Sequence, residues 1–132
     1  MSTTVTSTEV IKIAYDEATK SVIFEWLLSP TPEEYKAGLE TLGNALIAHK
    51  TSKLVANVEN AGAISEDLQH YTMHVWTPKI TAVVGDFITA VVLEENIFSQ
   101  LSIETMLEDE QNVSKTATFG NMKDALNWIA KQ

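Results

Sequence analysis

Two histidines spaced four residues apart are the first residues in this sequence that could do chemistry. His70 and His74 would share one face of a helix, with Glu66 one turn earlier, and two histidines at this spacing can bind a metal ion. However, the segment "HYTMH" lacks the glutamate that acts as general base in helical zinc-protease motifs, and no third ligand is evident. The pattern therefore favours exposed histidines, and we predict neither a metal site nor a cofactor.

Clustered carboxylates are the second candidate, because paired carboxyl groups can transfer protons when burial raises the pKa of one of them. The triplet "EDE" at positions 108–110 follows Glu104 by one helical turn. A charged run at a helix end is more often a solvated surface, and the sequence contains no cysteine and no nucleophile motif. We therefore predict no catalytic residue and keep a metal-dependent or carboxylate-based enzyme as the least favoured alternative.

A ligand site is predicted at the carboxyl ends of two buried strands, "KLVANVEN" and "FITAVVLEE". In open α/β sheets, ligands bind beyond the carboxyl ends of parallel strands, and aromatic side chains commonly line such sites. The competing interpretation, which the sequence favours, is that the aromatic residues belong to the core and the polar residues cap loops. The candidate ligand-binding residues are Asn57, Glu59, Asn60, Tyr71, Trp76 and Phe98.

The stretch "FSQLSIETMLEDE" (98–110) places apolar residues on two sides of a helix, if successive residues are about 100° apart. One face contains Phe98, and the opposite face contains Ile103, Met106 and Leu107. Two short helices would each have one apolar face, whereas a single helix would need a second molecule to cover the other. We favour the single helix, which predicts a homodimer with Ile103, Met106 and Leu107 at its interface.

Composition limits the classes of partner. The 132 residues carry a net charge of −9 and no arginine, so binding of nucleic acid or of an anionic lipid surface is disfavoured. The sequence has no cysteine, no signal peptide at its start and no apolar run of the roughly 20 residues that cross a bilayer. We expect a cytoplasmic protein without a membrane span.

Local patterns predict the elements that position these residues. Strands are expected at 10–15 and 22–28, paired as an antiparallel hairpin, and at 53–60, 87–95 and 115–119. Thr31, Ser65 and Asn121 would begin helices, with Pro32 and Glu34 completing a capping box after Thr31. Pro78 would end or reset the second helix, with Thr77 as a new cap.

The predicted fold is α/β, with a single mixed five-stranded sheet. It begins with the antiparallel hairpin, continues with parallel strands and has helices on both faces. The Ser- and Thr-rich residues 1–8 are predicted to be a disordered tail, and residues 9–132 a single domain.

Four segments in this order resemble the SpoIIAA-like family: "EEYKAGLETL", "ISEDLQ", "FSQLSIETMLEDE" and "TFGNMKDALNWI". This family is related to the STAS domains of anti-sigma-factor antagonists and is described as similar to CRAL-TRIO lipid-binding domains. The resemblance spans nearly the whole chain. It implies a STAS-like fold and a non-enzymatic binding or regulatory module that acts through a small apolar ligand or a partner protein.

The resemblance also offers a phosphorylation switch as an alternative. STAS antagonists are phosphorylated on a serine at the start of the helix after the third strand, and Ser65 occupies a comparable place in "AISEDL". A helix N-terminus favours an anion, but Glu66 and Asp67 would repel a phosphate, and the family's flanking Asp and Gly are missing. We favour N-capping as the role of Ser65 over a phospho-regulated antagonist.

Overall fold

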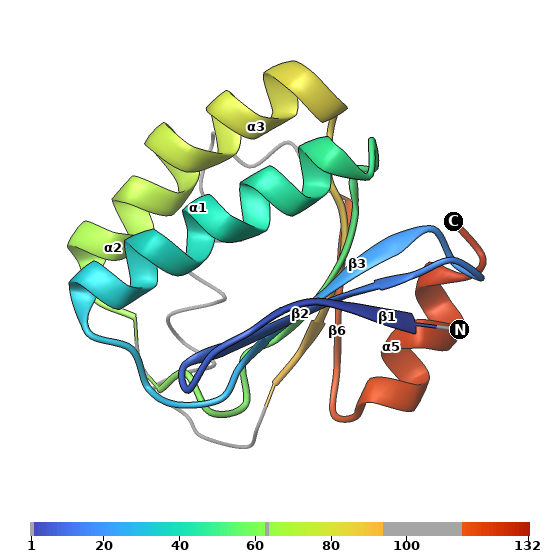
Figure 1. Ribbon diagram of the computed structural model, residues 1–132, viewed down its shortest axis with the longest axis horizontal. Helices are drawn as coiled ribbons and strands as arrows, with labels where there is room; N and C mark the ends of the chain where they lie inside the picture. Colours follow the sequence, from blue (N-terminus) through green and yellow to red (C-terminus); the bar gives the residue numbers. More distant parts are fainter. Residues whose placement is uncertain (1, 63, 94–114) are drawn as a thin grey trace.

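The computed structural model describes residues 2–62, 64–93 and 115–132 and shows an α/β fold around one mixed sheet (Figure 1). The first three strands pair antiparallel, and the third to the sixth pair parallel, in the order β1-β2-β3-β4-β5-β6. The strands are β1 (Ser2–Ser7), β2 (Ile11–Asp16), β3 (Ser21–Trp26), β4 (Lys53–Asn57), β5 (Ile88–Val92) and β6 (Lys115–Phe119).

The sheet has six strands rather than the predicted five, because β1 forms in the segment predicted to be a disordered tail. β1 spans Ser2–Ser7, within the residues 1–8 for which the sequence predicts a tail. This segment has little apolar alternation, which is why it resembles a tail, but it is rich in threonine, whose branched side chain favours strands. Among the described strands it pairs with β2 alone, with a register shift between Thr4 and Thr6.

Helices cover both faces of the sheet, as predicted (Figure 1). On one face lie α1 (Pro32–Ala48), α2 (Glu66–Tyr71), the π-helical turn η1 (Thr72–Trp76) and α3 (Thr77–Val84). On the other face, α5 (Met122–Ile129) packs on β4, β5 and β6. Buried side chains accordingly form two separate clusters, one on each side of the sheet.

The three predicted helix starts are confirmed. The Thr31 side chain accepts a hydrogen bond from the Glu34 backbone N–H, and the Glu34 carboxylate accepts one from the Thr31 N–H, which completes the capping box. Ser65 Oγ accepts from the Leu68 N–H, and Asn121 Oδ1 accepts from the Asp124 N–H.

A new α-helix, α3, begins at Thr77 beside Pro78, as the predicted reset implies, but Thr77 is its first residue rather than its cap, which is Trp76. The chain runs from α2 through η1 into α3, and Thr77 has helical dihedral angles of φ −58° and ψ −50°. Its N–H bonds to the carbonyl oxygen of Thr72, five residues earlier. A proline lacks the N–H that continues an α-helical ladder, and the wider π turn before Pro78 lets the helical path continue past it.

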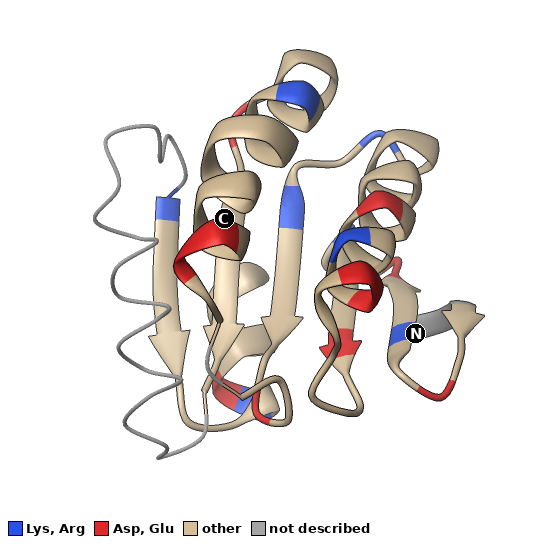
Figure 2. Ribbon diagram, turned by 90° about the vertical axis from the view of Figure 1, so that its left-hand side faces the viewer, with Lys and Arg blue, Asp and Glu red and all other residues tan. Residues whose placement is uncertain are grey.

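Charged residues occur along the helices and near the ends of strands (Figure 2), and those of the described helices are exposed. Glu66 and Asp67 are exposed in the first turn of α2, and Lys53 and Lys115 begin β4 and β6. The layer between the sheet and the helices is therefore left to apolar and uncharged polar side chains. Within the described ranges, no helix is both long enough and apolar enough to cross a bilayer.

Candidate functional site

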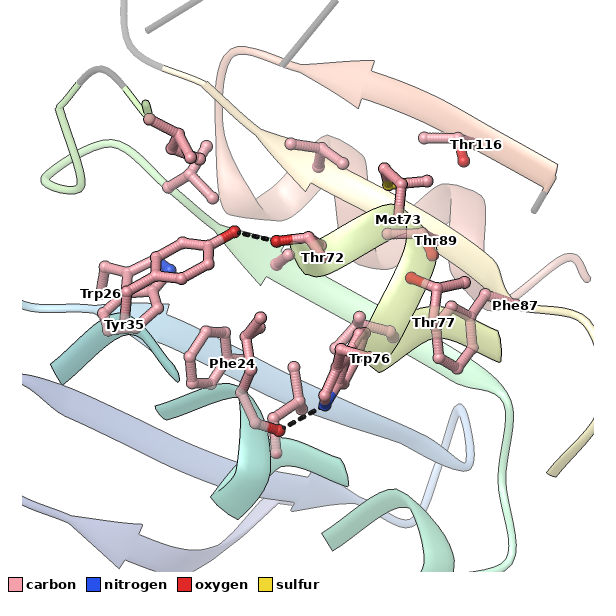
Figure 3. Close-up of a pocket in the computed structure, with 17 residues that line it drawn as sticks. Phe24, Trp26, Tyr35, Thr72, Met73, Trp76, Thr77, Phe87, Thr89 and Thr116 are labelled. Carbon is pink, nitrogen blue, oxygen red and sulfur yellow. Dashed lines mark hydrogen bonds between the residues drawn. The ribbon is translucent and has the colours of Figure 1, made fainter. Parts of the chain in front are cut away.

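A cavity of about 120 Å³ lies between the sheet and the α1, η1 and α3 layer (Figure 3). Side chains alternate between the two faces of a strand, so every second residue of β3, β4 and β5 reaches it. Its apolar walls include Phe24, Leu39, Leu54, Trp76, Phe87 and Val91. None of the described residues that line it carries a charge.

The cavity has the size of a small molecule. An apolar cavity of about 150 Å³ stays free of water and binds benzene, so a void of about 120 Å³ suits a single ring or a short aliphatic chain. It is smaller than the roughly 300–1,000 Å³ of pockets that take drug-sized ligands. The volume therefore favours a compact ligand over a long lipid.

Tyr35 supplies a fixed polar group to this cavity. Its hydroxyl lies 2.6 Å from Thr72 Oγ1, which itself donates to the carbonyl oxygen of Leu68 at 2.7 Å. Because a threonine hydroxyl has one proton, Tyr35 must donate to Thr72. Burial raises the pKa of Tyr35 to about 12, so the phenol is protonated at neutral pH. Tyr35 can therefore act as a hydrogen-bond donor there but not as a base.

Trp76 joins the helices over the cavity. Its Nε1 donates to the carbonyl oxygen of Leu39 on α1 at 2.7 Å, and its ring centroid lies 5.4 Å from that of Phe87. The hydrogen bond holds the indole in one orientation between α1 and β5. One wall of the cavity is therefore rigid without any bound ligand.

Three other polar groups lining the cavity have no hydrogen-bond partner among the described residues: Trp26 Nε1, Thr77 Oγ1 and Thr89 Oγ1. Trp26 is 2% exposed, Thr77 4% and Thr89 9%, so bulk water does not serve them. Buried polar groups are almost always hydrogen-bonded, and an unpaired one costs about 1–3 kcal/mol. Three unpaired polar groups around one cavity indicate that a molecule other than this chain can occupy it.

Trp26 is held with its donor away from α1. A Cβ at Gly38 would lie 2.6 Å from Cη2 of the indole, so the benzo end of the ring is directed at α1. Nε1 belongs to the opposite, pyrrole end of the ring. Trp26 also stacks on Tyr35, with centroids 5.5 Å apart and planes 9° apart, at one end of the pocket in Figure 3.

Of the residues predicted to bind a ligand, Trp76 lines this cavity and the other described ones do not. Asn57 Oδ1 accepts a hydrogen bond from the Glu59 N–H at 3.0 Å, as expected of a residue that caps a loop, and Asn60 is exposed. Tyr71 is half-buried, with Lys36 Nζ 5.1 Å from its ring centroid. Phe98 lies outside the described residues, and the role of the set stays a prediction.

The predicted histidine pair lies on the surface. His70 and His74 are exposed and stack with centroids 4.5 Å apart and planes 15° apart. Nitrogen lone pairs lie in the ring plane, so stacked rings do not direct them at one ion. In the part of the chain that the structure describes, no three His, Cys, Asp or Glu residues gather as metal ligands. Glu104 and the "EDE" triplet fall outside that part.

Ser65 is exposed, and its hydroxyl caps α2, which is the role the sequence favours. Ile103, Met106 and Leu107, the predicted interface, lie outside the described residues, as does the whole stretch 97–110 predicted as one helix or two. The predicted homodimer therefore stays a prediction, and the phospho-switch at Ser65 stays the alternative to N-capping.

Two features of the sequence mark the cavity. Thr89 is the one polar residue within the buried strand "ITAVV", and a lone hydroxyl there marks a place where the core is not purely apolar. Phe24 and Trp26 alternate along "SVIFEW", which puts two aromatic rings on one face of β3.

No protein-family model matches this chain, and searches of curated proteins and of solved structures return no similar protein.

Proposed function

We propose that this protein is a non-enzymatic binding module that holds a small, uncharged and mainly apolar molecule in the cavity between the sheet and α1, η1 and α3. One observation carries the proposal: an apolar void of about 120 Å³ coincides with buried polar groups that lack a protein partner. A purely structural core would be expected to fill the void and pair the groups.

The absence of charge among the described lining residues selects the class of ligand. A charged group buried without a counter-ion would lose its hydration, so a carboxylate or ammonium compound is disfavoured. The net charge of −9 further disfavours the approach of anions. The ligand class is therefore a neutral molecule that buries apolar surface against Phe24, Trp76 and Phe87.

The polar groups of the cavity suit binding better than catalysis. With its pKa raised to about 12, Tyr35 holds its proton at neutral pH and gives it in a hydrogen bond to Thr72. The threonine hydroxyls have no base beside them among the described lining residues, so nothing there activates a nucleophile. A binding or regulatory module is also what the resemblance to SpoIIAA-like proteins implies, and that assignment is part of the proposal.

The proposal is tested by benzene in a thermal unfolding experiment. A ligand that binds only the folded state raises the unfolding temperature, by an amount that grows with its concentration. Ala56→Ile adds three carbon atoms to a residue that lines the cavity and should abolish this rise. The matched control is Ala117→Ile, since Ala117 is half-buried and follows Thr116, so it points to the opposite face of the sheet.

Parent and Ala117→Ile are expected to show the same benzene-dependent rise, and Ala56→Ile none. A rise of equal size in all three proteins would place benzene elsewhere, and no rise in any of them would contradict the proposed function.

A further inference from the structure

Two threonine hydroxyls from different layers face the same part of the cavity. Thr77 begins α3 above the sheet, and Thr89 lies on β5 within it. In Figure 3 their oxygen atoms point toward one another, beside Met73 and Phe87. No hydrogen bond joins the two hydroxyls, so each of them presents a donor and an acceptor to the space between them.

Two neighbouring threonines show that a threonine hydroxyl in this helical segment can donate to a backbone carbonyl oxygen. Thr72 Oγ1 donates to the Leu68 carbonyl oxygen at 2.7 Å, and Thr81 Oγ1 donates to the Thr77 carbonyl oxygen at 2.9 Å. A helical threonine commonly bonds to the carbonyl four residues earlier in this way. Thr77 is more deeply buried than Thr81 and makes no such bond within the described residues. Its hydroxyl is therefore directed into the cavity.

We propose that the ligand carries an oxygen atom, as a hydroxyl or a carbonyl group, that sits between Thr77 and Thr89. This inference rests on the proposed function and narrows its ligand class to small neutral alcohols, phenols or carbonyl compounds. A ligand hydroxyl donates to one threonine and accepts from the other, and a carbonyl accepts from both. The apolar part of the ligand lies against Trp76 and Phe87, whose rings adjoin this end of the cavity.

Toluene and phenol form a matched pair of probes, because they differ only in a methyl group against a hydroxyl of similar size. In a cavity without hydrogen-bonding groups, the phenol hydroxyl would lose its hydrogen bonds to water and gain none from the protein. Toluene would then bind more tightly than phenol. With Thr77 and Thr89 as partners, phenol recovers those bonds. We expect phenol to bind the parent protein at least as tightly as toluene in isothermal titration calorimetry.

Replacing the hydroxyls by methyl groups should reverse this preference. In Thr77→Val and Thr89→Val, phenol affinity should fall about tenfold, the loss expected for a net hydrogen bond, while toluene affinity changes less than about twofold. Ligand-free unfolding temperatures should stay level or rise, since each change removes an unpaired buried hydroxyl. Thr89→Ser keeps the hydroxyl and should keep the preference for phenol.

The matched control is Thr81→Val, which removes a hydroxyl that bonds to its own helix and does not line the cavity. Its affinities for both probes should equal those of the parent. A parent that prefers toluene by tenfold or more would overturn the inference, and so would valine variants that weaken both probes equally. Either result with benzene still bound leaves the proposed function standing, whereas failure of benzene, toluene and phenol together refutes that function itself.

Discussion

The two faces of the sheet differ in how completely they are packed. On the α5 face, the apolar cluster has five buried members that are completely inaccessible to solvent: Val55, Ala90, Val92, Ala125 and Ile129. On the opposite face, a larger cluster of aliphatic and aromatic residues surrounds a cavity and includes buried hydroxyl and indole groups. One sheet therefore has a closed face and an incompletely filled one.

We infer from this difference that stability and ligand binding depend on opposite faces of the sheet. A void and an unpaired polar group each lower the free energy of unfolding, so their concentration on one side of the sheet requires an explanation other than folding. We infer that the α5 face maintains the sheet while the other face keeps room for a ligand. Changes on the two faces should therefore affect different measurements.

The largest effect is expected on the closed face. Ile129→Ala removes three carbon atoms from a side chain that is 0% exposed, and such a deletion typically costs about 2–5 kcal/mol in the free energy of unfolding. Urea unfolding measures this loss. Benzene affinity of the folded variant should equal that of the parent, because Ile129 packs across the sheet from the cavity. Loss of benzene binding in the folded variant would contradict the separation of the faces.

The cavity face should respond to alkaline pH through Tyr35. Its pKa is about 12 when folded and about 10 when unfolded, so its stabilising contribution is complete below pH 10 and is lost as pH rises toward 12. This pKa difference between the folded and unfolded states corresponds to roughly 2–3 kcal/mol in the free energy of unfolding. The urea midpoint of unfolding should fall further between pH 9 and pH 11.5 in the parent than in Tyr35→Phe.

An absorbance titration of tyrosinate provides the control. The chain has three tyrosines, and the component that titrates near pH 12 should vanish in Tyr35→Phe. If all tyrosines of the parent ionise together near pH 10 while the protein is folded, Tyr35 is not buried as described.

A smaller effect is expected where α1 closes on the cavity. Gly38→Ala would bring a Cβ within 2.6 Å of the Trp26 ring, and this overpacking costs about 1–3 kcal/mol against a gain of up to about 1 kcal/mol in helix propensity. A Cβ at Gly43 would lie 2.7 Å from the flexible end of Ile80, which can rotate away, and 3.2 Å from Trp76 Nε1, a milder contact than that at Gly38. Thermal unfolding should show a net loss of about 1 kcal/mol for the first change only. Equal stability of the two variants would contradict the tight Gly38 contact.

Local chemistry explains which elements the sequence predicts correctly. Thr31, Ser65 and Asn121 begin helices because each side chain bonds to a backbone N–H three residues later, an interaction contained within one turn. The hairpin and the parallel strands follow from alternation and element order. These features depend on neighbours along the chain, so a sequence pattern can identify them.

Features that depend on distant partners escaped prediction. β1 exists because β2 offers a free edge, and its own residues resemble those of a tail. The helical path through Pro78 depends on a π turn whose pattern the sequence does not mark. The cavity arises where residues of β3, β5, α1 and η1 meet, and of the predicted site residues that the structure describes, Trp76 alone lines it.

The most direct test of the account locates a bound ligand by nuclear Overhauser effects between benzene protons and the three tryptophan rings. Trp26 and Trp76 line the cavity, whereas Trp128 packs on the opposite face of the sheet. We predict cross-peaks from benzene to the Trp76 indole and the Met73 methyl group, and none to Trp128. Cross-peaks confined to Trp128 or to exposed residues such as Val83, or no cross-peaks at saturating benzene, would contradict a ligand site between the sheet and the α1, η1 and α3 layer.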